Sequence, residues 1–199
     1  MSSRWFGTKT RMMVSRACAI GGFLYVTVTQ TDYLPHWALE VSELIGFLFL
    51  GVASFGRIWC LVFIAGRKRD VLVVSGPYSV VRNPLYLFSF IGAIGLGLAT
   101  QAPALAGLLA VAFASYYHFV VKREETSLLT KFGGEYRAYL ASVPRWIPSL
   151  RRFAEPEEMT IKPAKVRKGI FGATWFLWVF LLWEVVENLH EKGYLLFFR

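Results

Sequence analysis

The chain has 199 residues, of which 55% are hydrophobic and 17% aromatic, and its mean hydropathy is +0.45. Only 18% of its residues are charged, whereas a soluble globular domain usually carries about a quarter. Together with several long apolar runs, this composition excludes an ordinary soluble domain and indicates an all-α integral membrane protein.

Five apolar segments are candidate membrane spans, because a bilayer core needs about 20 apolar residues per helix. Only Thr100-Gln-Ala-Pro103 separates the third span from the fourth. This short connection predicts a tight antiparallel hairpin, with Pro103 in the first turn of the returning helix. The five predicted spans cover about residues 12–30, 44–65, 85–99, 103–121 and 170–188.

Basic residues are distributed unevenly between the connections. Eleven Lys and Arg residues fall in 122–169, whereas 31–43 contains acidic residues and no Lys or Arg. The positive-inside rule therefore places the N-terminus and both polar loops in the cytoplasm and the C-terminus outside. The net charge of +9 is then explained by a basic rim that faces anionic membrane lipids, and it does not support nucleic-acid binding.

The chain shows no sign of metal chemistry in its sequence. Cys18 and Cys60 lie inside apolar runs, and the three histidines, at 36, 118 and 190, are scattered. Zinc sites usually bring their ligands in closely spaced pairs. We therefore expect neither a metal site nor a disulfide.

The polar loop before the third span, Ser75-Gly-Pro-Tyr-Ser-Val-Val-Arg-Asn-Pro-Leu-Tyr86, combines turn formers, aromatics and an arginine. Gly76-Pro77 predicts a turn, and Pro84 suits the first turn of the next helix. Asn83 would then be the N-cap, with its side chain on free backbone N–H groups. A helix N-terminus beside an arginine favours an anion such as a carboxylate or phosphate. Helix capping alone leaves three residues of the loop without a role: Tyr78, Arg82 and Tyr86.

A second polar segment follows the hairpin, at the point where the fourth helix leaves the membrane. Glu124 and Glu125 are adjacent and must face different sides of the helix, so we expect different roles for them. A cationic ligand such as a sulfonium or an ammonium would match one of them. Tyr136 and Tyr139 are three residues apart and share a helical face, suited to an aromatic base or to the headgroup belt. Arg145 follows a proline in a stiff turn and could clamp an anion.

The ordered set of these motifs resembles the isoprenylcysteine carboxyl methyltransferase family and the related phospholipid methyltransferases. The matching pieces are Gly-Pro-Tyr, Val-Arg-Asn-Pro-Leu-Tyr, the apolar hairpin, Arg-Glu-Glu, Phe-Gly…Tyr-Arg-Ala-Tyr and Pro-Arg-Trp-Ile-Pro. The resemblance implies that S-adenosylmethionine binds in a cytosol-facing pocket and that a lipophilic acceptor enters from the bilayer between helices. We expect a single domain in which 1–66 form the N-terminal spans, 67–149 the catalytic core, 150–169 a cytosolic linker and 170–199 the last span and tail.

The resemblance identifies matching positions, and for three of them we hypothesise roles. Glu125 would bind the methionyl amino group or another polar part of the cofactor, and Arg82 or Arg145 would hold a carboxylate of the cofactor or acceptor. Asn83 stands where the isoprenylcysteine enzymes usually have histidine, and it cannot act as a general base because its amide does not titrate near neutral pH. The full set of expected cofactor-binding residues is Tyr78, Asn83, Pro84, Tyr86, Glu125, Tyr136, Tyr139 and Arg145.

The acceptor decides what the protein must add to the chemistry. The sulfonium is already an activated methyl donor, so a carboxylate acceptor needs mainly alignment and exclusion of water. An amine acceptor must also lose a proton, for which Glu124, Glu125 or His118 are the available bases.

One arginine lies inside a predicted span. Arg57 falls within the second span, where a charge costs at least about 2.5 kcal/mol on insertion scales. It would snorkel to the cytoplasmic end, pair with Glu124 or Glu125, or contact the head group of the acceptor. With Arg82 and Glu124, it completes the candidate catalytic residues.

The sequence thus indicates a membrane methyltransferase that uses S-adenosylmethionine and acts on a lipophilic acceptor, such as a prenylcysteine-like carboxylate or a lipid head group. The small size and compact loops favour a prokaryotic plasma membrane. Two alternatives stay open at this point. One is a membrane sterol or lipid reductase that uses NADPH, although such reductases tend to carry Arg-His-x-Asn-Tyr in place of Arg82-Asn-Pro-Leu-Tyr86. The other is a non-catalytic lipid-binding scaffold, which the asparagine at position 83 keeps open.

Overall fold

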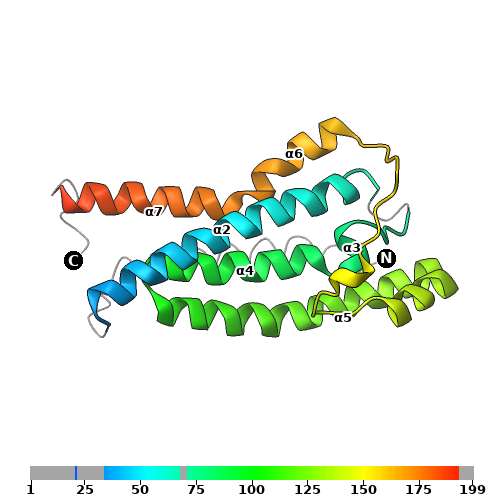
Figure 1. The fold of residues 1–199 in the computed structure, drawn as a ribbon, viewed down its shortest axis with the longest axis horizontal. Coiled ribbons are helices and arrows are strands. Elements are labelled where there is room, and N and C mark those ends of the chain that lie inside the picture. Colours follow the sequence, from blue (N-terminus) through cyan, green and yellow to red (C-terminus); the bar gives the residue numbers. More distant parts are fainter. Residues whose placement is uncertain (1–20, 22–33, 68–70, 193–199) are drawn as a thin grey trace, which may run out of the picture.

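The structure is a computed structural model that describes residue 21, residues 34–67 and residues 71–192. Within these ranges, every regular element is helical. The long helices run roughly side by side in an elongated bundle, and the short elements gather at one end (Figure 1). The elements in chain order are α2 (His36–Ile64), α3 (Pro77–Val80), α4 (Pro84–Ala99), α5 (Pro103–Ser142), the 3₁₀ turn η1 (Leu150–Arg152), α6 (Pro163–Ala173) and α7 (Trp175–Glu191).

Helix α2 matches the second predicted span but begins at His36, eight residues before the predicted start. Its first two turns carry polar residues, including Glu40 and Glu43. The apolar run therefore begins later than the helix does. Its 29 residues correspond to about 43 Å at 1.5 Å per residue. The first predicted span, 12–30, lies outside the described residues except for Gly21.

Helix α4 packs against α2 at very short range. A Cβ atom placed on Gly46 of α2 would lie 2.1 Å from the backbone nitrogen of Ala99, at the end of α4. A side chain at position 46 would therefore separate the two backbones. The core between these helices and α7 is built from buried residues that include Leu50, Ala93 and Phe176.

The predicted hairpin between the third and fourth spans is confirmed. Pro84 and Pro103 each lie in the first turn of their helix, α4 and α5, and only 100–102 connect the two. Helix α5 covers 40 residues and runs far beyond its predicted end near Val121; its unbroken part, 103–132, corresponds to about 45 Å. At Gly133 the backbone leaves the helical region, with φ 53° and ψ −118°, so the last turns of α5 form a separate short helix.

The last predicted span was wrong in two respects. It was expected as one helix over 170–188 after a linker at 150–169, but α6 already begins at Pro163 and is bent by 41° from α7 at Thr174. The early start follows from Pro163 in the first turn of α6, and the bend involves a residue of α2. Arg57 donates from Nε to the Ala173 carbonyl at 3.0 Å and from Nη2 to the Gly172 carbonyl at 2.7 Å. These bonds pair carbonyls that the end of α6 leaves free.

By length and composition, α2 and α5 can each cross a membrane, and the bent pair of α6 and α7 can form a third span. Helix α4, with 16 residues, is apolar but shorter than the length that a full span needs. The total of five spans therefore stays a prediction.

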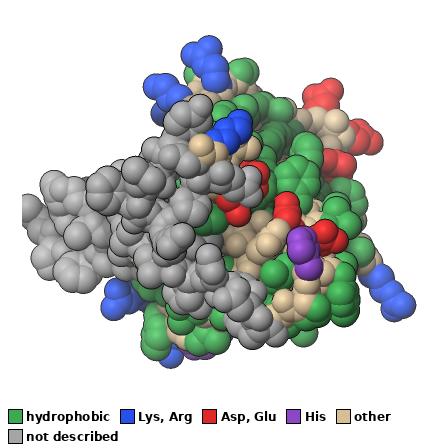
Figure 2. Space-filling view, turned by 90° about the vertical axis from the view of Figure 1, so that its left-hand side faces the viewer, with side chains coloured by type: hydrophobic (Ala, Val, Ile, Leu, Met, Phe, Trp, Pro, Cys, Tyr) green, Lys and Arg blue, Asp and Glu red, His purple; other side chains and the backbone are tan. Residues whose placement is uncertain are grey.

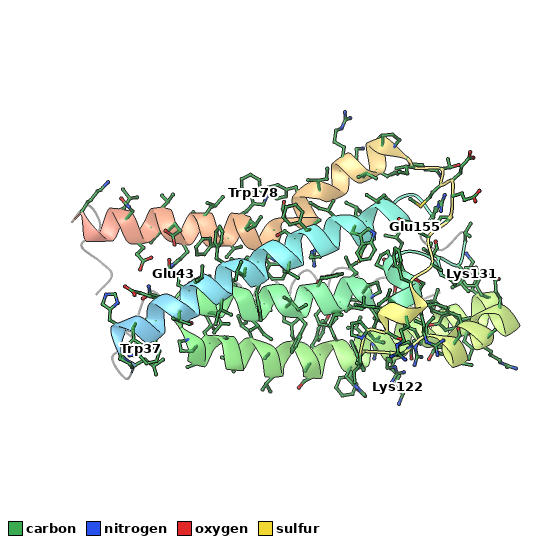
Figure 3. The ribbon with its side chains drawn as sticks, in the orientation of Figure 1. Trp37, Glu43, Lys122, Lys131, Glu155 and Trp178 are labelled. Carbon is green, nitrogen blue, oxygen red and sulfur yellow. The ribbon has the colours of Figure 1, made fainter. Side chains whose placement is uncertain are left out.

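The two ends of the bundle differ in charge. Trp37 and Glu43 lie at one end, and Lys122, Lys131 and Glu155 lie at the other (Figure 3). Viewed end-on from the side where α2 begins, acidic side chains and a histidine gather on the described surface (Figure 2). His36 and Glu40 form a contact of 3.4 Å there, one turn apart on α2.

Candidate functional site

Two segments that are far apart in the sequence are joined at the end of the bundle where α3 lies. Residues 143–162, which we call the strap, leave the end of α5 and cross the loop that precedes α4 (Figure 1). Backbone hydrogen bonds connect Arg82 N to the Pro144 carbonyl at 2.9 Å and Ser149 N to the Val80 carbonyl at 3.0 Å. The two polar motifs expected to form a site are therefore held together by main-chain bonds. A further bond, from Gly76 N to the Ala154 carbonyl at 2.7 Å, holds the first part of the predicted linker against the loop.

Gly76 makes the sharp entry to this loop possible. Its φ of 59° lies in the left-handed region, and a Cβ atom there would sit 2.3 Å from the ring of Phe63. The predicted turn at Gly76-Pro77 opens directly into the short helix α3. Ser79 was not expected to matter, yet its buried hydroxyl donates to the Gly76 carbonyl at 2.7 Å and accepts from Ala154 N at 3.0 Å. This serine fixes the strap against the loop.

A buried carboxylate lies between two arginines at the centre of this region. Glu125 is only 9% exposed. Arg82 donates from Nη1 to its Oε1 at 3.1 Å, and Arg145 donates from Nε to the same oxygen at 3.1 Å and from Nη2 to Oε2. The hydrogen bonds from Arg145 form a two-pronged contact, the strongest common geometry for this pair, and the carboxylate raises the pKa of the Arg145 guanidinium. The cluster of Arg82, Glu125 and Arg145 carries a net positive charge.

Tyrosines surround the charged cluster. Tyr86 donates its hydroxyl to Glu124 Oε2 at 2.6 Å, so the adjacent glutamates do have different partners. Tyr139 donates to the Tyr78 carbonyl at 2.7 Å, and its ring lies 5.8 Å from that of Tyr136, as their spacing of three residues predicted. Burial raises the pKa of the Tyr78 phenol well above its ordinary value, which keeps this hydroxyl protonated.

Several buried polar atoms at this site have no hydrogen-bond partner among the residues that the structure describes. They are the hydroxyl of Tyr78, Nε of Arg82 and Nδ2 of Asn83. Asn83 is the N-cap of α4 as predicted, but its side chain makes no capping hydrogen bond, so that part of the prediction was wrong. Burying an unpaired polar group costs about 1–3 kcal/mol. Three such groups beside a charged cluster indicate a place built for a polar ligand.

Two other candidate residues lie away from the charged cluster. Arg57 donates from Nη1 to the hydroxyl of Ser89 and from its other nitrogens to the end of α6, and its guanidinium lies 5.5 Å from the ring centre of Phe176. Its contacts therefore differ from the pairing with Glu124 or Glu125 that was one of three expectations. His118 is exposed on the outer surface of α5, apart from the buried carboxylate.

Aromatic residues that were not predicted extend the site toward the bundle. The ring of Tyr117 on α5 lies 4.7 Å from that of Tyr86 on α4, and Phe113 lies 4.8 Å from Tyr117. Ser89, one turn after Tyr86 on α4, meets Arg57. The four-residue spacing of Phe113 and Tyr117 was visible in the sequence but is equally typical of a packed core.

Comparison with known proteins assigns the chain to a family. The family model described as phospholipid methyltransferase matches residues 47–135, which run from α2 through the hairpin to both glutamates. The chain belongs to the phospholipid methyltransferase family. It is thus an integral membrane protein of a methyltransferase family, as its motifs indicated, and the reductase and scaffold alternatives are not favoured.

Relatives of this phospholipid methyltransferase family member carry different names. The cobalt-zinc-cadmium resistance protein CzcN of Cupriavidus metallidurans is 33% identical over 80% of this chain and 73% of its own length. The nickel-cobalt-cadmium resistance protein NccN of Alcaligenes xylosoxydans xylosoxydans is 34% identical over 96% of this chain and 89% of its own length. Protein-S-isoprenylcysteine O-methyltransferase of Schizosaccharomyces pombe is 29% identical over 54% of this chain and 49% of its own length. No solved structure matches the chain.

Proposed function

We propose that the chain transfers a methyl group from S-adenosylmethionine to a lipophilic acceptor at the end of the bundle that carries α3 and the strap. The observation that supports this most is the cluster of Arg82, Glu125 and Arg145, which joins the two polar motifs of the family in one buried, charged group. S-adenosylmethionine carries a carboxylate, an ammonium and a sulfonium, so it needs partners of both signs.

The residues present fit such a cofactor. The two arginines share one carboxylate and retain donors for the carboxylate of the methionyl part. We assign Glu125 to holding both guanidinium groups in place, because they already bind both of its oxygens. Glu124 is then the glutamate for the ammonium group. The unpaired donors of Arg82 and Asn83 and the tyrosines at positions 78, 136 and 139 complete the contact.

When bound, S-adenosylmethionine supplies an activated methyl group, so the protein contributes mainly alignment and exclusion of water. A carboxylate or other anionic oxygen acceptor requires no base. An amine acceptor would require one, and because Glu124 is assigned to the ammonium group of the cofactor, the proposed arrangement favours an acceptor that needs no base. The aromatic pair of Tyr86 and Tyr117 and the guanidinium of Arg57 lie deeper in the bundle, where we propose that they face the acceptor.

The charge difference between the two ends supports the proposed orientation. The strap and α6 carry basic residues at the site end, whereas the first turns of α2, at the other end (Figure 1), carry His36, Glu40 and Glu43. We propose that the site faces the cytoplasm of a prokaryotic cell. The names of two relatives further suggest that methylation contributes to heavy-metal resistance. A deletion strain complemented with Glu124→Gln should then stay as cadmium-sensitive as the deletion itself, and full rescue would reject this link.

The experiment that tests the proposed function combines binding with product formation. Purified protein in detergent should be stabilised against heat by S-adenosylhomocysteine and not by NADP, with a gain of about 2.7 kcal/mol at a ligand concentration of 100 times Kd. Arg145→Gln should reduce this stabilisation, whereas Arg137→Gln, an exposed arginine on the last turns of α5, should not. Incubation with labelled donor and total membrane lipid should give a labelled lipid. Stabilisation by NADP alone would overturn the proposal.

A further inference from the structure

The strap carries an apolar surface that nothing in the described part of the protein covers. Ile147 is 81% exposed and Leu150 is 79% exposed, and an exposed apolar patch rimmed by polar residues marks a contact with another protein or with a membrane. Leu150 and Phe153 are one turn apart in the 3₁₀ geometry of η1, so they lie on the same side. Arg151 and Arg152, between them, are exposed as well.

The depth of this surface relative to the membrane follows from α2. The ring of Phe153 lies 6.0 Å from that of Trp59, a half-exposed residue five positions before the end of the helix at Ile64. Five residues correspond to about 7.5 Å along a helix. With α2, about 43 Å long, centred on a bilayer core about 30 Å thick and perpendicular to it, Trp59 would lie near the boundary between acyl chains and headgroups. In this placement Phe153, which packs beside Trp59, lies at headgroup depth.

The surroundings of this surface are strongly basic. Between residues 143 and 168 the chain has seven Lys and Arg residues against three glutamates. Helix α6, which contributes exposed basic residues, is fixed at the same end of α2, because Lys162 donates to the Gly66 carbonyl at 3.1 Å and Gly169 packs against Leu61. Positive charge at headgroup depth is complementary to anionic lipid. Each Lys or Arg near the surface raises the affinity for an anionic membrane about fivefold.

We propose that residues 147–153 form an anionic-lipid anchor. In this anchor Ile147, Leu150 and Phe153 enter the boundary of the acyl layer beside α2, and Arg151 and Arg152 bind the phosphate groups of anionic phospholipids. The anchor begins two residues after Arg145, so it connects the lipid surface to the charged cluster. It does not depend on the proposed methyl transfer, because the contacts that define it involve neither cofactor nor acceptor.

The test uses the full chain in nanodiscs of phosphatidylcholine alone or mixed with phosphatidylglycerol. Hydrogen–deuterium exchange of the backbone amides in 147–153 should be at least tenfold slower when phosphatidylglycerol is present. The double variant R151Q/R152Q should lose this difference and should bind phosphatidylglycerol at least tenfold more weakly by native mass spectrometry. The matched control K131Q/R137Q removes two exposed charges from the C-terminal part of α5 and should behave as the wild type.

Each other outcome rejects the proposal. Equal exchange in both lipids would show that the segment does not bind anionic headgroups, even if it is slower than in detergent. Equal loss in R151Q/R152Q and K131Q/R137Q would show a diffuse effect of net charge. Both variants lie on the exposed surface, and their unfolding, followed by tryptophan fluorescence, should match that of the wild type. Neither readout requires activity, so failure of the anchor and failure of the proposed function remain distinguishable.

Discussion

Replacing Glu125 with glutamine tests whether the charged cluster supports the structure of the site. The substitution keeps the shape of the side chain but removes its charge and turns one oxygen into a donor that faces a guanidinium. Glu125 is 11% exposed at the side chain and its partner Arg82 is 17% exposed, so water can replace the lost interaction only in part. Breaking a buried pair of this kind costs about 3–5 kcal/mol.

For Glu125→Gln the expected loss in the free energy of unfolding is smaller than that range. The reason is that the side chain of Arg145 is 35% exposed and glutamine can still accept one hydrogen bond. We expect about 2–3 kcal/mol, which corresponds to a fall in Tm of about 4–12 °C for a chain of this size. The measurement is thermal unfolding of the detergent-solubilised protein by tryptophan fluorescence. Glu135→Gln, an exposed glutamate on the last turns of α5, is the matched control.

The cluster also makes a prediction about combined variants. Because Glu125 and Arg145 share their hydrogen bonds, the double variant E125Q/R145Q should lose less stability than the two single variants added together, by at least about 0.5 kcal/mol. Additive losses, or a Tm for Glu125→Gln equal to that of the Glu135→Gln control, would refute the view that a buried pair holds the loop and strap together.

Three further variants test separate parts of the fold. Gly46→Ala should lower Tm because its new methyl group would meet the α4 backbone, whereas Gly51→Ala, with open space around it, should be neutral or gain up to about 1 kcal/mol. Tyr139→Phe should lower the free energy of unfolding by about 1–3 kcal/mol, because it leaves the buried Tyr78 carbonyl unpaired. An unfolding curve equal to that of the wild type would contradict this. Arg57→Met should free two carbonyls at the end of α6 and speed hydrogen exchange around the bend at residue 174; unchanged exchange there would show that the bend does not need this arginine.

The sequence predicted the parts of the fold that depend on local chemistry. Prolines at positions 84 and 103 set the starts of α4 and α5 within one residue, and the connection of 100–102 could only join neighbouring antiparallel helices. The spacing of Tyr136 and Tyr139 likewise placed their rings on one helical face. Each of these features is decided by residues within a few positions of one another.

The remaining features depend on contacts between distant segments. The bend at Thr174 has no proline to mark it, and it becomes understandable only when Arg57 is seen to bind the end of α6. The partners of Glu125 could not be chosen from the sequence, because Arg82 and Arg145 reach it only after the strap has crossed the loop. Candidate residues could thus be named in advance, but their pairing could not.

The uninterrupted part of α5 also fixes how far the two glutamates lie from its membrane span. From Pro103 to Phe132 the backbone of α5 stays helical, so Val121, fully buried, and Glu125, one turn later, keep a fixed relation to each other and to the span. Inserting or deleting one residue before them would move the carboxylates by about 1.5 Å and turn them by about 100°. The length of this helix therefore fixes the position of the glutamates along its axis. Only an insertion or deletion of about one full turn would move Glu125 along the axis and still leave it facing Arg82 and Arg145.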